Sequence, residues 1–174
     1  MPMSTPTRVR LADFLLNPEI DESRLELIDG EVVAKPMPTW GHARVANRIG
    51  SLLEAFGSAG VEPRAVIQSA NASLIPDVAF YRTGEPDESE YMHSPPHLAV
   101  EVMSPGQGIP FMRRKAALYA RFGVECTWVV DLNRREVHVF ELGTERTLGL
   151  GQRLTTPAVP GLDIDVSALF PAPG

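Results

Sequence analysis

The chain has 174 residues, of which 44% are hydrophobic and 22% are charged, and it carries a formal net charge of -6. This length suits one domain with a buried core, and the composition is that of an ordinary globular protein. The net charge excludes a protein that binds polyanions through a basic surface as a whole, so any contact with nucleic acid must be local.

The beginning of the chain is polar and contains proline, which predicts a flexible N-terminus over residues 1–10 and a single domain over residues 11–174. It lacks the charged start and long apolar stretch of a signal peptide. No apolar run approaches the roughly 20 residues that span a bilayer. We therefore expect a cytoplasmic protein without a membrane segment.

A short helix and a hairpin are predicted first. Residues 7–17 carry apolar side chains at helical spacing. Residues 24–36 form two short alternating runs around Asp29 and Gly30. This dipeptide is typical of a tight hairpin turn, because glycine readily adopts the positive φ that the turn requires.

A longer helix is predicted over residues 39–57. Its apolar side chains recur every three or four residues and therefore lie on one helical face. Thr39 is expected to cap the start of this helix and Gly57 its end. A helix with one apolar face should lie on a sheet.

The rest of the chain is predicted to supply most of that sheet. Residues 64–70 and 76–82 should form two strands joined by a turn around Asn71. After an acidic loop, residues 97–104 form a nearly continuous apolar run, which suits a central strand buried on both faces. A helix over residues 111–122, a hairpin over residues 126–142 and a closing segment over residues 154–170 follow. This order predicts an α/β fold with a mixed β-sheet flanked by helices.

Lysine is rare in this chain, which has 16 basic residues but lysine only at Lys35 and Lys115. Lys115 lies in the middle of an apolar helical face, in line with Phe111 and Leu118. A buried ammonium group is unfavourable unless it meets a carboxylate or reaches water. Either the Lys115 head extends to solvent at the helix edge, or it lies over buried acids. The rarity of lysine favours the second interpretation, because catalysis uses a compact charge with a tunable pKa.

Asp77 and Glu101 are carboxylates inside predicted buried strands. Burying a carboxylate is unfavourable unless it is paired. Taken singly, each acid is explained by a salt bridge to an arginine or by a strand-end cap as well as by a functional site. Together on adjacent strands they would form a hard oxygen site for Mg²⁺ or Mn²⁺. Such an ion activates water and stabilises charge on a phosphoryl group.

His42 and two further acids lie where they could form the rim of the same site. His42 is in the first turn of the predicted helix, in line with its apolar face. Glu26 and Glu31 flank the predicted hairpin turn. The alternative for His42 is a hydrogen-bonded histidine at the edge of the core, and for the two glutamates it is a solvent-exposed hairpin face.

Six segments carry a resemblance to a known family. In chain order they are "RLELIDGEVV", "PTWGHARV", "IPDVAFY", "HLAVEVMSP", "RRKAALYARFGVECTWVVD" and "PGLDIDVSALF". They resemble the Uma-type putative restriction endonuclease family, a large bacterial group of the PD-(D/E)XK nuclease superfamily. The resemblance extends over residues 25–170, and the order and spacing of the segments carry it more than any single motif.

This resemblance implies a restriction-endonuclease-like core with a metal-dependent phosphodiesterase site. By it, Asp77 is the first metal ligand and Glu101 is the second acid. The lysine of the superfamily signature, two residues after the second acid, is Met103 here. The family supplies this charge from the following helix, at the position of Lys115.

Three further positions enter through the same resemblance. Glu26 and His42 match residues at the rim of the family's site, where either could assist proton transfer. Phe111 stands where family members commonly carry an aspartate one helical turn before the lysine. A catalytically impaired copy of the enzyme is therefore one of the alternatives.

The resulting hypothesis is a metal-dependent endonuclease. One divalent ion, Mg²⁺ or Mn²⁺, would be held by Asp77, Glu101 and the backbone carbonyl of Val102. Lys115 would position the attacking water or stabilise the charge that develops on the phosphoryl group.

DNA is the expected partner, and a homodimer is expected because a symmetric pair of sites can reach both strands. Arg113 and Arg114 could contact a phosphate backbone, although a solvated helix face is the simpler interpretation. Two alternatives stay open. One is a nuclease-fold module that binds or regulates without cleaving, and the other is a metal-dependent hydrolase of a small phosphorylated molecule, which would not need a basic surface.

Overall fold

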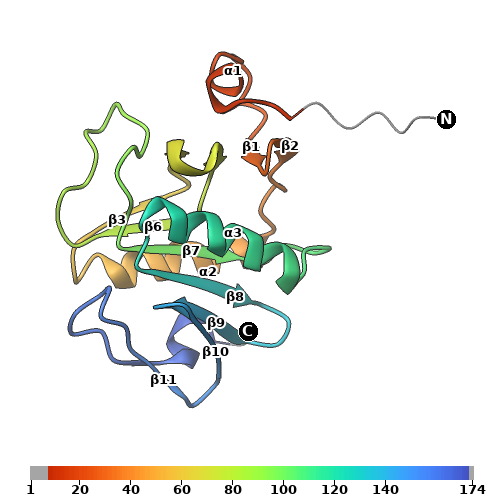
Figure 1. Ribbon diagram of the computed structural model, residues 1–174. Coiled ribbons are helices and arrows are strands. Elements are labelled where there is room, and N and C mark those ends of the chain that lie inside the picture. The colour runs from red at the N-terminus through yellow and green to blue at the C-terminus, as the bar shows by residue number, and fades with distance from the viewer. Residues whose placement is uncertain (1–7, 173–174) are drawn as a thin grey trace.

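The computed structural model describes residues 8–172, and Figure 1 shows its ribbon. Residues 1–7 lie outside the described part of the chain, so the expected flexibility of residues 1–10 stays a prediction there. Directly after them, the amide of Val9 donates to the carbonyl oxygen of Gly30 over 2.8 Å.

A mixed six-stranded sheet forms the centre of the fold (Figure 1). The strands run in the order β10-β9-β8-β7-β6-β3, in which β7 and β8 pair in parallel and the other neighbours are antiparallel. Their bounds are β3 Ser58–Val61, β6 Val78–Tyr81, β7 Leu98–Val102, β8 Cys126–Asp131, β9 Glu136–Glu141 and β10 Thr144–Gly149. Every residue of β7 and β8 is buried, as expected of central strands that are covered on both faces. The predicted α/β fold with a mixed sheet is confirmed.

Helices cover both faces of this sheet. Their bounds are α2 Trp40–Leu53 and α3 Ile109–Phe122. One face packs against α2 and against a C-terminal segment made of β11 Arg153–Leu154, β12 Ile164–Asp165 and the 3-10 helix η2 Val166–Leu169. The opposite face packs against α3, which links the parallel strands β7 and β8. No helix within residues 8–172 combines the length and the apolar character needed to cross a membrane.

A second, four-stranded sheet has the order β2-β1-β5-β4. Its bounds are β1 Leu25–Ile28, β2 Glu31–Ala34, β4 Ala65–Ile67 and β5 Ala72–Leu74. β1 and β2 form the predicted hairpin, in which Asp29 and Gly30 have φ values of 52° and 82°. The short helix α1 (Leu11–Leu15) is shorter than predicted and buries Leu11 and Phe14 against this part of the chain.

The predicted strands at residues 64–70 and 76–82 are not partners. β4 ends at Ile67 and is followed by the 3-10 turn η1 (Gln68–Ala70). Asn71, with φ 48°, then turns the chain into β5, which pairs back onto β4. β6 instead lies in the six-stranded sheet, between β7 and β3. Local patterns do not indicate which strands pair. β3, β5 and β10 were not predicted at all, because β5 has only three residues and β3 and β10 lack a buried apolar run.

The helix ends agree with the predictions in part. The Thr39 hydroxyl accepts an amide from the first turn of α2 over 3.3 Å, and α3 ends at Phe122 as predicted, followed by Gly123 with φ 111°. α2 ends at Leu53, however, so Gly57 is not its cap. Gly57 is required for close packing, because a Cβ atom there would lie 2.5 Å from the carbonyl oxygen of Tyr81.

Candidate active site

Asp77 and Glu101 lie on neighbouring segments at one end of the central sheet. Asp77 directly precedes β6, and Glu101 lies in the adjacent strand β7. The β6–β7 pairing ends at Val78 and Val100, and the Asp77 amide donates to the same Val100 carbonyl over 2.9 Å, one residue out of that register. Both carboxylates are buried, at 1% and 2% exposure. The charge of Asp77 disfavours the ionised form of Glu101, so this pair requires cations nearby.

Lys115 supplies one of these cations from α3. Its Nζ atom lies 2.8 Å from Glu101 Oε1, and it donates to Glu26 Oε1 and Oε2 over 3.0 and 3.2 Å. Tyr119, one turn later on the same helix, donates its hydroxyl to Glu101 Oε1 over 2.5 Å. Lys115 is 1% exposed, so it lies over buried acids and does not extend to solvent. The second interpretation of the apolar helical face is confirmed.

Lys35, directly after β2, supplies the other cation, and it was not among the predicted site residues. Its Nζ atom donates to Asp77 Oδ1 over 2.7 Å and to the Ile75 carbonyl over 2.5 Å. The amide of Val102 donates to the other oxygen of Asp77 over 2.6 Å. The sequence did contain a signal for Lys35 as a site residue, because Lys35 and Lys115 are the two lysines of the chain.

His42 approaches Asp77 from α2. Its Nε2 atom lies 3.3 Å from Asp77 Oδ2, and its Nδ1 atom is buried without a hydrogen-bond partner among residues 8–172. A cavity of about 200 Å³ opens beside it, and Asn47, Glu62, His42 and Asp77 are among its lining residues. The site is therefore approached from the side of Asp77 and His42, whereas Lys115 lies behind them.

The structure brings Glu26 into this group but leaves Glu31 out. Glu26 Oε1 accepts the amide of Ile75 over 2.8 Å in addition to its contact with Lys115. Glu31 is exposed on the hairpin, which agrees with the alternative of a solvated hairpin face.

The two arginines of α3 are engaged on the surface. Arg113 pairs with Glu145 over 2.9 Å, and Arg114 pairs with Asp29 over 2.7 Å. Both side chains are about half exposed, as on an ordinary solvated helix face.

The pKa values of the buried groups are shifted in different directions. Burial raises the pKa of Asp77, but the hydrogen bond from His42 and the charge of Lys35 outweigh it and hold that pKa below the usual 3.8. Burial raises the pKa of Glu101 above 4.5 in spite of Lys115. Burial lowers the pKa of Lys115, but the charges of Glu101 and Glu26 outweigh it and raise that pKa above 10.5. Asp77 is thus more acidic than Glu101, and Lys115 keeps its proton at neutral pH.

The lowered pKa of Asp77 predicts a specific loss of stability in acid. Above pH 3.8 the paired Asp77 carboxylate contributes stability, and this contribution is lost as the pH falls below 3.8 toward the folded-state pKa. We expect the difference in free energy of unfolding between the wild type and the double variant Asp77→Asn/Lys35→Met to shrink between pH 6 and pH 3. Urea unfolding at the two pH values measures it. Glu101, whose raised pKa acts in the opposite direction, is present in both proteins, and an unchanged difference would contradict the prediction.

The carboxylate oxygens that Asp77 and Glu101 supply to this site are of the chemical type that a hard divalent cation prefers. The three carboxylates of Glu26, Asp77 and Glu101 exceed the two ammonium groups by one negative charge when all are ionised. Lys35 already occupies one oxygen of Asp77, so a cation bound there must displace the ammonium group. The amide of Val102 faces Asp77, and the expected metal contact of its carbonyl stays a prediction.

Comparison with known proteins identifies related chains. The family model described as Uma2, putative restriction endonuclease, matches residues 11–167. A solved structure with a similar fold is that of a putative nuclease belonging to DUF820 from Anabaena variabilis ATCC 29413. It superposes with a TM-score of 0.81 and covers 93% of this chain and 97% of its own, at 21% sequence identity. Likeness at this identity concerns the fold. No curated protein matches the chain.

Proposed function

Because this chain belongs to the Uma2 family of putative restriction endonucleases, we propose that it is a metal-dependent endonuclease that hydrolyses phosphodiester bonds of DNA. One observation carries this proposal. Two buried carboxylates, Asp77 and Glu101, lie close enough to influence each other's charge, and a buried lysine from the next helix contacts one of them. Such a group is unfavourable in a purely structural core, and hydrolysis of a phosphodiester requires charges of this kind.

In the proposed mechanism, Asp77, Glu101 and the carbonyl of Val102 would hold Mg²⁺ or Mn²⁺, and the ion would supply positive charge to the phosphoryl group and activate water. Lys115 keeps its proton and stabilises the negative charge of the transition state. His42, beside Asp77 at the cavity, and Glu26, bound to Lys115, assist proton transfer.

The cavity beside Asp77 favours a polymer over a small phosphorylated substrate. Pockets that enclose small ligands usually begin at about 300 Å³. The cavity lined by His42 and Asp77 has about 200 Å³. It suits a single backbone phosphate that enters from the surface better than a molecule that must be enclosed.

A non-cleaving module of the same fold is the second candidate, and the lysine contacts favour it. Lys35 occupies Asp77 Oδ1, and Lys115 occupies Glu101 Oε1, so both acids are paired within the protein. Phe111 also lies half-buried on α3, where the family commonly has an acid. A core satisfied in this way can persist without metal or catalysis.

Plasmid cleavage tests the proposed function. Supercoiled plasmid incubated with the purified protein and Mn²⁺ is expected to be nicked, and EDTA is expected to prevent it. Single-stranded DNA and RNA in parallel reactions define the substrate, and sedimentation of the same protein tests the proposed homodimer. Metal binding without cleavage of any nucleic acid would favour the non-cleaving module.

Lys35 is expected to compete with metal for Asp77. In the variant Lys35→Met, the metal-free protein should lose about 3–5 kcal/mol of stability, because Asp77 stays buried without its partner. Mn²⁺ should then raise the melting temperature more in this variant than in the wild type, since Asp77 Oδ1 is free. Thermal unfolding with and without Mn²⁺ measures both effects.

Arg44→Met is the matched control for this comparison, because it removes one positive charge from α2 outside the site. It should leave both melting temperatures close to those of the wild type. An equal effect of Mn²⁺ on Lys35→Met and on the wild type would contradict the competition.

A further inference from the structure

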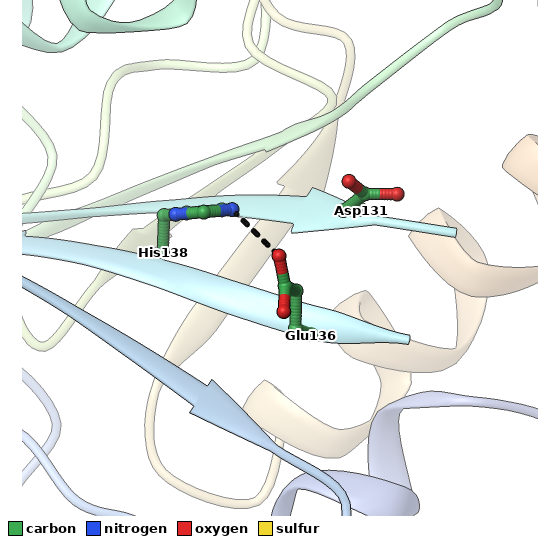
Figure 2. Close-up of side chains that lie close together, drawn as sticks. All are labelled: Asp131, Glu136 and His138. Carbon is green, nitrogen blue, oxygen red and sulfur yellow. Dashed lines mark ion pairs between the residues drawn. The ribbon is translucent and has the colours of Figure 1, made fainter. Parts of the chain in front are cut away.

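A pair of facing carboxylates lies at the turn end of the β8–β9 hairpin. Asp131 ends β8, Glu136 begins β9, and the two residues are direct cross-strand partners. His138 lies two residues farther along β9 and therefore on the same face of the sheet. One oxygen of each acid and one ring nitrogen of His138 lie within 4.8 Å of one another (Figure 2). Facing carboxylates repel, so this pair also requires a nearby cation.

The imidazole of His138 points into this group with an unused nitrogen. His138 is 7% exposed, and its Nε2 atom has no hydrogen-bond partner within residues 8–172. Figure 2 shows the ring directed at Glu136, whose Oε1 atom lies 3.4 Å from Nε2. On the other side of the ring, Nδ1 lies 3.0 Å from the hydroxyl of Thr147. When Nδ1 donates its hydrogen to Thr147, Nε2 presents a lone pair to the two carboxylates.

The surrounding residues provide partners for the two acids but no hydrogen bond for the Nε2 atom of His138. Asp131 Oδ1 accepts the amides of Asn133 and Arg134 over 2.9 and 3.0 Å, as a turn-capping aspartate does. Arg134 Nη1 lies 3.8 Å from Glu136 Oε1, but its side chain is 75% exposed, and such pairs contribute little. Neither contact satisfies the buried Nε2 atom of His138. A cation between the three side chains would satisfy it and would also offset the repulsion of the acids.

We propose that Asp131, Glu136 and His138 form a binding site for a divalent transition-metal ion such as Zn²⁺. One imidazole nitrogen and two carboxylate oxygens are a ligand set that suits Zn²⁺ better than Mg²⁺. Ligand bonds of about 2.1 Å place tetrahedral ligands roughly 3.4 Å apart, so a small contraction of the group is sufficient. Glu136 is partly exposed, which leaves room for water as a fourth ligand.

This site is separate from the candidate active site, although both lie on the same face of the central sheet. The pairing Glu101 to Val129, and Val129 to His138, places His138 two strands from Glu101 in one cross-strand row. The two sites share no side chain. An ion bound here would link β8 to β9 and stabilise the turn end of this hairpin. The proposal does not depend on nuclease activity.

Zinc titration of the metal-free protein, followed by the ¹⁵N resonances of its histidine rings, tests the site. The chain has 4 histidines, and His138→Gln identifies the His138 signal by its loss. We expect about one equivalent of Zn²⁺ to shift the Nε2 resonance of His138. The His42 ring reports on the candidate active site, so binding there would shift His42 instead. An unshifted His138 resonance would overturn the proposal.

Glu136→Gln separates metal binding from folding. It should lower the affinity for Zn²⁺ about 10-fold or more, because one ligand is weakened. The metal-free variant should be at least as stable as the wild type, because the repulsion from Asp131 is removed. Glu88→Gln, which changes an exposed acid in the loop before β7, is the matched control and should bind Zn²⁺ like the wild type. Equal affinity in Glu136→Gln and in the wild type would exclude Glu136 as a ligand.

Discussion

Replacing Asp77 with Asn is expected to lower the rate of plasmid cleavage by about a thousandfold. The amide keeps the size of the side chain but removes the negative charge that would hold the metal ion. Loss of about 4 kcal/mol of transition-state stabilisation corresponds to this factor. Cleavage of supercoiled plasmid at fixed Mn²⁺ concentration measures the rate, and calorimetry with Mn²⁺ is expected to show lost binding at this site.

A folding control is needed for this variant, because Asp77→Asn leaves the ammonium group of Lys35 buried without a carboxylate. The double variant Asp77→Asn/Lys35→Met removes both charges at nearly constant volume. It should be more stable than Asp77→Asn alone and still fail to cleave DNA. Cleavage at the wild-type rate by this folded double variant would exclude Asp77 from catalysis.

Replacing Lys115 with Met is expected to lower the free energy of unfolding by about 3–5 kcal/mol. Lys115 is fully buried, and its Nζ atom contacts both Glu26 and Glu101. The variant leaves these two carboxylates without their shared cation, while Tyr119 still donates to Glu101. Urea unfolding at pH 7 measures the difference in free energy.

Two further variants show whether the loss comes from the buried contacts. Arg114→Met removes a cation from the exposed side of the same helix, where the surface pair with Asp29 contributes less than about 1 kcal/mol. Lys115→Met/Glu101→Gln also removes one of the two buried carboxylates left without a cation, and it should recover part of the lost free energy of unfolding. A loss from Lys115→Met no larger than that from Arg114→Met would contradict a buried ion network at this position.

Local patterns were sufficient for several features of this protein. The turn at Asp29 and Gly30 adopts the left-handed conformation that the dipeptide favours. The spacing of apolar residues along α3 correctly directed Lys115 toward the sheet, because helical periodicity reports which side chains share a face. The acids Asp77 and Glu101 were recognisable as buried because they interrupt apolar strands.

The tertiary structure alone decided how these pieces meet. Lys35 and Asp77 are 42 residues apart, and their contact depends on the place where the β1–β2 hairpin docks beside the central sheet. The proximity of Asp77 to Glu101 depends on the pairing of β6 with β7, and the cross-strand row that relates His138 to Glu101 depends on the order of three strands. Periodicity shows which face of an element is buried, but it contains no information on which distant element covers that face. For this reason the separate residues were predictable, whereas the lysine that occupies Asp77 and the second cluster at the β8–β9 hairpin were not.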